Sequence, residues 1–262
     1  MGIGESLTKG FSVSVRSGVL FFVLFIFGFV FNLINVLAFQ NPPSPEPKTS
    51  TLVAAFSIGV VFILLSIYVQ AGTLGYIRDR VKLGSVNFST FFSSGAKYYV
   101  RLFLVGLLVA LIVGALLVLA GLVAALLTGK LSVLGIALAI LIAALGIYLV
   151  VLLFFAPYIV VAGDQPAWAS IKQSVAFVRK NILPILGIAI LLVLIGLVIG
   201  VLLGLISGLT AVAIKGVASQ MVFAFLSSLV NAFLGILVTA TFMNFYFGRT
   251  TGAAPQAQAN PA

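Results

Sequence analysis

The sequence contains no cysteine and no histidine among its 262 residues. Disulfides, thiol nucleophiles, thiolate or imidazole metal sites and histidine acid–base chemistry are therefore excluded. Acidic residues are scarce, and none of them lies inside an apolar run: Glu5, Glu46, Asp79 and Asp164. The chain therefore has too few carboxylates in its apolar runs to form a carboxylate pair, a carboxylate metal site or an intramembrane proton relay. We therefore expect a protein that is not an enzyme and that holds no metal and no other cofactor.

Apolar residues dominate what is present. They make up 63% of the chain, charged residues make up 7%, and the mean hydropathy is +1.33, which is typical of an integral membrane protein. Since a bilayer requires about 20 apolar residues per helix, the apolar runs predict an all-α, polytopic membrane domain at 1–249 with six transmembrane helices. The tail, 250–262, is expected to be disordered. The predicted spans are about 19–39, 51–76, 102–127, 131–163, 182–207 and 221–247.

The distribution of the bases predicts an orientation. If both termini are cytoplasmic, only Lys48, Lys130 and Lys215 of the 14 Lys and Arg residues lie outside. The positive-inside rule therefore favours a multi-pass protein of the cell membrane with cytoplasmic N and C termini. The net charge of +10 could also suggest nucleic acid. No folded nucleic-acid-binding module surrounds the bases, so we expect no nucleic-acid partner.

A basic amphipathic segment lies between the fourth and fifth spans. Its apolar side chains recur at helical spacing on one face: Trp168, Ile171, Val175, Val178 and Ile182. Lys172 and Arg179 flank this face, and Lys180 follows. We predict a cytoplasmic interfacial helix whose bases contact anionic lipid headgroups or a partner protein. The alternative interpretation is a solvated connector.

Small polar residues precede the first, third and fifth spans in a similar frame. The pairs are Ser6 and Gly10, Thr90 and Ser94, and Ser170 and Ser174. Small side chains four residues apart would let a neighbouring helix approach closely. The pattern predicts three repeated units, each a surface helix followed by a transmembrane hairpin. Chance similarity between apolar segments remains the alternative.

Two further features lie within the predicted spans. Span five carries a glycine at every fourth position, which predicts close packing with another helix, either of this chain or of another subunit. These glycines are Gly196, Gly200, Gly204 and Gly208. Span six holds Asn231 near its middle, with Ser227 on the same face, and span one holds Asn32 and Asn35. Such groups form hydrogen bonds between helices or, alternatively, line a polar substrate path.

The run from Ala156 to Asn181 (APYIVVAGDQPAWASIKQSVAFVRKN) resembles a pattern in six-span bacterial and archaeal membrane proteins. Pro157 ends the fourth span, a helix of small residues and serines follows, and Lys180-Asn181 opens the fifth span. The pattern is similar to that of the membrane domain of glycerophosphodiester phosphodiesterases and related uncharacterised integral membrane proteins. The resemblance implies a fold and not an activity, because the metal-binding acidic and histidine residues of the phosphodiesterase domain have no counterpart in this sequence.

These observations lead to two hypotheses. The first is a non-enzymatic membrane scaffold or accessory subunit that contacts anionic lipid and a membrane-protein partner, or a second copy of itself. The second is a carrier or permease for a lipid or small apolar solute, with a cavity between the repeated hairpins and Asn231 in its lining. An intramembrane enzyme is disfavoured because the apolar runs lack general acid–base groups.

Overall fold

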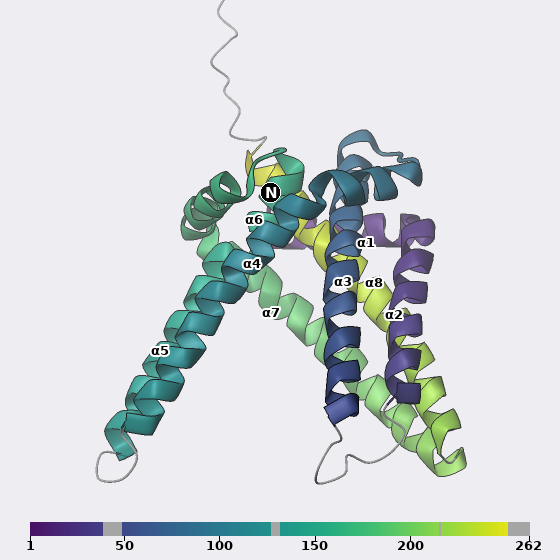
Figure 1. Ribbon diagram of the computed structural model, residues 1–262. Coiled ribbons are helices and arrows are strands. Elements are labelled where there is room, and N and C mark those ends of the chain that lie inside the picture. The colour runs from purple at the N-terminus through teal and green to yellow at the C-terminus, as the bar shows by residue number, and fades with distance from the viewer. Residues whose placement is uncertain (39–48, 127–131, 215, 251–262) are drawn as a thin grey trace, which may run out of the picture. The chain divides into compact units, whose positions relative to one another are not determined.

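The computed structural model is all-helical. It describes residues 1–38, 49–126, 132–214 and 216–250, and these contain no strand (Figure 1). The helices are α1 (Ile3–Arg16), α2 (Gly18–Ala38), α3 (Thr49–Leu83), α4 (Ser89–Leu126), α5 (Ser132–Leu153), α6 (Ala156–Ala162), α7 (Ala167–Ala213) and α8 (Val217–Thr250). Six segments of this part of the chain are long and apolar enough to cross a membrane. The prediction of an all-α protein with six membrane spans is confirmed. The tail predicted to be disordered lies almost entirely outside the described residues.

Helices α3 and α4 are longer than the spans that the sequence predicted. α3 continues past the expected end at residue 76 to Leu83, where Gly84 follows with a φ of +74°, a left-handed conformation that glycine adopts without strain. α4 begins at Ser89, whose backbone amide donates a hydrogen bond to the Asn87 side chain at 3.2 Å. The predicted surface helix and span three are therefore one continuous helix.

Span four is interrupted, and span five is kinked. α5 ends at Leu153, and the short helix α6 begins at Ala156 with Pro157 in its first turn, where the missing proline N–H costs no helical hydrogen bond. The single span expected over 131–163 is therefore two helices. In α7 the surface helix joins span five through Asn181, whose φ of −126° and ψ of 23° are not helical.

The chain forms two compact units, and each has its own core. Residues 1–96 and 183–262 make up the first, and residues 97–182 make up the second. In the first unit α8 packs against α1, α2 and α3 (Figure 1). The fully buried side chains of the first unit include Leu20, Ile77, Ile236, Met243 and Phe245. Those of the second unit include Tyr98, Phe155, Val160, Val161 and Val178.

Small residues mediate two close helix contacts in the first unit. Gly10 of α1 lies directly against Thr241 of α8, so that a Cβ atom at Gly10 would collide with the Thr241 side chain and backbone. Gly75 of α3 lies equally close to the side chain of Ser94, at the start of α4. The small residues before spans one and three therefore allow helices to approach closely.

In the second unit the surface part of α7 packs through its serines. Ser170 and Ser174 are fully buried, and the Ser174 hydroxyl donates a hydrogen bond to the Leu152 carbonyl of α5 at 2.7 Å. Ile171 is buried beside them, whereas Trp168 is 61% exposed. The buried face of this helix is thus centred on the serines, and the Trp168 side chain lies outside it.

Candidate functional site

The four glycines of span five form a surface that nothing in the described part of the chain fills. We call Gly196, Gly200, Gly204 and Gly208 the glycine face of α7. A Cβ atom at any of them would meet no other group within 4 Å in the described residues. By contrast, a Cβ atom at Gly187, nearer the start of the same span, would contact Ile3 of α1. The glycine face is therefore open to a helix from outside this unit.

The sequence pattern drew attention to Asn231 and Ser227 of span six, but the hydrogen bond between helices in the first unit involves other residues. The Asn32 side chain of α2 donates a hydrogen bond to the Ser228 hydroxyl of α8 at 2.9 Å, across 196 residues of sequence. Ser228 is buried and donates in turn to the Ala224 carbonyl at 2.6 Å. The Ser227 hydroxyl also bonds within its own helix, to the same carbonyl at 3.1 Å, and Asn231 is exposed. The contact between helices is thus made by Asn32 and Ser228.

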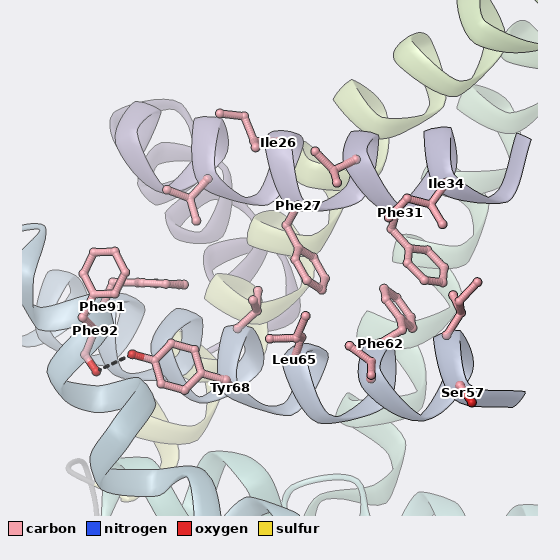
Figure 2. Close-up of a pocket in the computed structure, with 15 residues that line it drawn as sticks. Ile26, Phe27, Phe31, Ile34, Ser57, Phe62, Leu65, Tyr68, Phe91 and Phe92 are labelled. Carbon is pink, nitrogen blue, oxygen red and sulfur yellow. Dashed lines mark hydrogen bonds between the residues drawn. The ribbon is translucent and has the colours of Figure 1, made fainter. Parts of the chain in front are cut away.

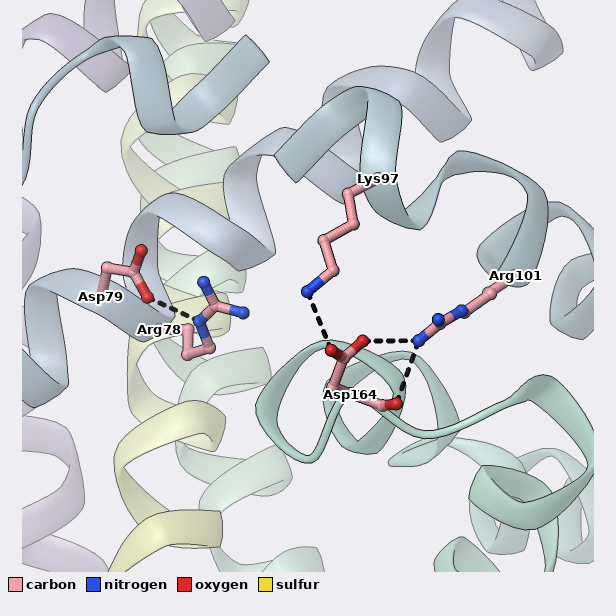
Figure 3. Close-up of polar contacts among 5 residues, drawn as sticks. All are labelled: Arg78, Asp79, Lys97, Arg101 and Asp164. Carbon is pink, nitrogen blue, oxygen red and sulfur yellow. Dashed lines mark hydrogen bonds and ion pairs between the residues drawn. The ribbon is translucent and has the colours of Figure 1, made fainter. Parts of the chain in front are cut away.

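A cluster of charges holds the connection between α6 and α7 in the second unit (Figure 3). Lys97 donates to the Asp164 carboxylate at 2.8 Å, and Arg101 donates to the same carboxylate at 2.5 Å and to the Asp164 carbonyl at 3.0 Å. Asp164 has a φ of +52°, a conformation that aspartate tolerates better than most residues. The hydrogen bonds from Lys97 and then Arg101 hold the pKa of Asp164 below its ordinary value. The sequence pattern places Asp164 outside the apolar runs but does not indicate its pairing with Lys97 and Arg101.

The surface bases of α7 lie on the exposed side of its first turns. The Lys172 ammonium is 5.5 Å from the centre of the Trp168 ring, within the range of a cation–π interaction. Arg179 and Lys180 are exposed about two turns after Lys172. This mixture of an aromatic ring and exposed bases suits an anionic membrane surface. Contact with lipid or with a partner at these residues remains a prediction.

A pocket of about 690 Å³ lies in the first unit, between α2 and α3 (Figure 2). The rings of Phe31 and Phe62 stack across it with centroids 3.5 Å apart, and the Tyr68 hydroxyl at one end donates to the Phe92 carbonyl at 3.1 Å. The sequence did not indicate this pocket, because it depends on how two apolar helices lie against each other. It is lined by Val23, Ile26, Phe27, Val30, Phe31, Ile34, Ser57, Ile58, Val61, Phe62, Leu65, Tyr68, Val69, Phe91 and Phe92.

The helices and these surfaces define a polytopic α-helical membrane protein. The model of the family described as a domain of unknown function, DUF7847, matches residues 1–248, and the chain belongs to this family. No curated protein and no solved structure matches the chain.

Proposed function

We propose that this protein is a non-enzymatic membrane scaffold or accessory subunit that binds another membrane protein, or a second copy of itself, through the glycine face of α7. The open glycine face is the observation that carries the proposal. In lipid, apolar side chains gain little by leaving the acyl chains, so helix association depends on close packing of small residues. A stripe that no helix of its own unit covers, among the residues that the structure describes, is suited to a helix of a partner.

Asn231 of α8 supports the same proposal independently. Its amide is exposed near the middle of a span, and a polar group that meets only hydrocarbon costs several kcal/mol. A partner helix that offers a hydrogen bond would remove this cost. Intramembrane amides stabilise helix pairs in this way.

The membrane setting belongs to the same proposal. We place the protein in the cell membrane with both termini in the cytoplasm, which puts Trp168, Lys172, Arg179 and Lys180 at the surface of the anionic leaflet. The similarity of layout to the membrane domain of glycerophosphodiester phosphodiesterases supports a role that needs no catalytic group of its own. On this basis the surface bases add lipid contact to the partner contact of α7.

The pocket between α2 and α3 favours the second candidate, a carrier for a lipid or small apolar solute. Its lining is apolar and its size is that of a ligand site. Asn231, which we expected in a substrate path, is not among its lining residues. Flux of a labelled lipid or apolar solute in proteoliposomes, lost in a variant with the pocket residue Val61→Trp that still folds, would favour the carrier over the scaffold.

Purification in a mild detergent followed by mass spectrometry of the bound proteins tests the scaffold proposal. We expect a stoichiometric protein partner, or a dimer of this chain, that Gly200→Leu and Gly204→Leu remove. The matched control is Gly121→Leu in α4, where a Cβ atom also meets nothing within 4 Å. A chain that is monomeric and without a protein partner before any substitution would contradict the proposal.

A further inference from the structure

We infer that the pocket between α2 and α3 is a binding site for one acyl chain of an anionic membrane phospholipid. This inference does not rest on the scaffold proposal, because the pocket and the glycine face are formed by different helices. A scaffold, a carrier or neither could hold a structural lipid at this place.

The pocket opens sideways toward the lipid. Val30 is 48% exposed and Val61 is 56% exposed, although both line the pocket. α2 and α3 are both long and apolar enough to be membrane spans, so this opening lies in the hydrocarbon of the bilayer. Water in this opening would find few hydrogen-bond partners. An apolar occupant is therefore needed to fill the space between the helices.

The dimensions of the pocket fit one hydrocarbon chain. Its lining on α2 runs from Val23 to Ile34, which corresponds to about 16 Å along the helix axis, or about half of the roughly 30 Å hydrocarbon core. The pocket is therefore about as long as the part of the bilayer that one acyl chain spans.

One end of the pocket has the character of a membrane interface. Tyr68, Phe91 and Phe92 close this end, and the Tyr68 hydroxyl is held by the Phe92 carbonyl (Figure 2). Tyrosine is one of the residues that gather where the hydrocarbon meets the headgroups. The polar end of a bound lipid would therefore lie beyond these rings, and its chain would run along Phe62 toward Ser57.

Bases gather beyond the same end and complement an anionic headgroup. The Arg80 guanidinium donates to the Arg16 carbonyl at 2.9 Å, which brings the ends of α1 and α3 together. Lys82 follows two residues later, with its ammonium 4.8 Å from the Phe247 ring centre. The nearest acid in this segment, Asp79, is already paired with Arg78 at 2.6 Å. An excess of positive charge at this end selects an anionic lipid over a zwitterionic one.

Photo-crosslinking of the full-length protein tests the inference. The protein is reconstituted into vesicles of phosphatidylglycerol and phosphatidylcholine with a trace of phosphatidylglycerol that carries a diazirine on its acyl chain, and the labelled peptides are mapped by mass spectrometry. We expect labelling concentrated on 23–34 and 57–69. Val61→Trp fills the pocket and should lower this labelling to the level of the other spans. Its matched control is Val60→Trp, since Val60 is also exposed but lines no part of the pocket.

The outcomes separate the possible occupants. Labelling lost in Val61→Trp but retained in Val60→Trp, and competed more strongly by unlabelled phosphatidylglycerol than by phosphatidylcholine, supports the inference. Val30→Trp fills the pocket from α2 and repeats the test if Val61→Trp does not fold. Even labelling of all lipid-facing helices would overturn the inference. Equal competition by the two unlabelled lipids would also overturn it. A third contrary result is labelling that neither Val61→Trp nor Val30→Trp changes, while either variant disrupts a dimer of the chain.

Discussion

At the scale of single residues, the contact between Asn32 and Ser228 links two helices that the sequence keeps far apart. We expect Ser228→Ala to lower the free energy of unfolding by about 0.6–1.7 kcal/mol, the range measured for such bonds in membrane proteins. The neighbouring substitution Ser227→Ala serves as the control, because Ser227 bonds only within its own helix. Unfolding in mixed detergent measures both variants. An equal effect of the two alanines would contradict a specific role for Asn32.

The ion pairs of Asp164 should make the stability of the connection between α6 and α7 depend on pH. Hydrogen bonds from Lys97 and Arg101 lower its pKa, so their stabilisation is fully present above the ordinary carboxyl pKa of about 3.9 and is lost as the pH falls through the lowered value. Trp168, the only tryptophan, lies four residues away and reports on this connection by fluorescence. We expect Asp164→Asn to lower the temperature of the Trp168 transition at pH 7, and this effect should shrink as the pH falls below about 3.9 through the lowered pKa of Asp164.

A matched substitution at Glu5 separates this effect from general acid sensitivity. Glu5 is also exposed, and the hydrogen bond from Lys9 lowers its pKa, but it lies in α1 of the other unit. Glu5→Gln should leave the Trp168 transition unchanged at every pH. If Asp164→Asn and Glu5→Gln behave alike, the ion pairs of Asp164 do not stabilise the connection between α6 and α7.

The sequence was sufficient to identify the polar residues within the spans, but it was not sufficient to predict which of them form hydrogen bonds with each other. Asn32, Ser227, Ser228 and Asn231 all lie in apolar runs, and composition alone marks them as groups that need hydrogen bonds. Which serine faces α2 depends on the rotation of α8 about its axis. A rotation of one residue, about 100°, separates Ser227 from Ser228.

At the scale of elements, the contact of α1 with α8 depends on the absence of a side chain at Gly10. A Cβ atom there would collide with the Thr241 backbone as well as its side chain, and the backbone cannot move aside as a flexible side chain can. We expect Gly10→Ala to lower the free energy of unfolding by about 1–3 kcal/mol, as overpacking does elsewhere. Gly4→Ala in the same helix meets no neighbour and should change it by less than about 1 kcal/mol. Proteolysis of α1 measures the detachment directly.

Helix existence was predictable from the sequence, whereas helix ends and faces were less so. Long apolar runs leave no alternative to helices in a bilayer, because every backbone group must be paired internally. The continuity of α4 from Ser89 was missed because polarity, which changes near Arg101, was taken as a boundary although nothing there breaks a helix. Apolar spacing places Trp168 on the apolar face of its helix but cannot distinguish a face buried in protein from one that faces lipid, and the structure leaves Trp168 61% exposed.

At the scale of the whole molecule, the distribution of the bases predicts the orientation in the membrane. Because the chain has no cysteine, single cysteines can be introduced and labelled from outside with a maleimide that does not cross membranes. We expect Ser44→Cys to react in intact cells and Thr251→Cys to react only after permeabilisation. The reverse pattern would contradict the positive-inside assignment and move Trp168 and its bases to the outer surface.

The central claim, that α7 binds a partner through its glycine face, is tested most directly by crosslinking in the native membrane. A thiol-reactive benzophenone is attached to a single cysteine at Gly200, Gly204 or Leu202, the last of which points to the opposite side of the helix. We expect one discrete protein adduct from Gly200→Cys and Gly204→Cys and only lipid adducts from Leu202→Cys. Protein adducts of equal yield from all three positions, or lipid adducts alone from all three, would contradict the claim.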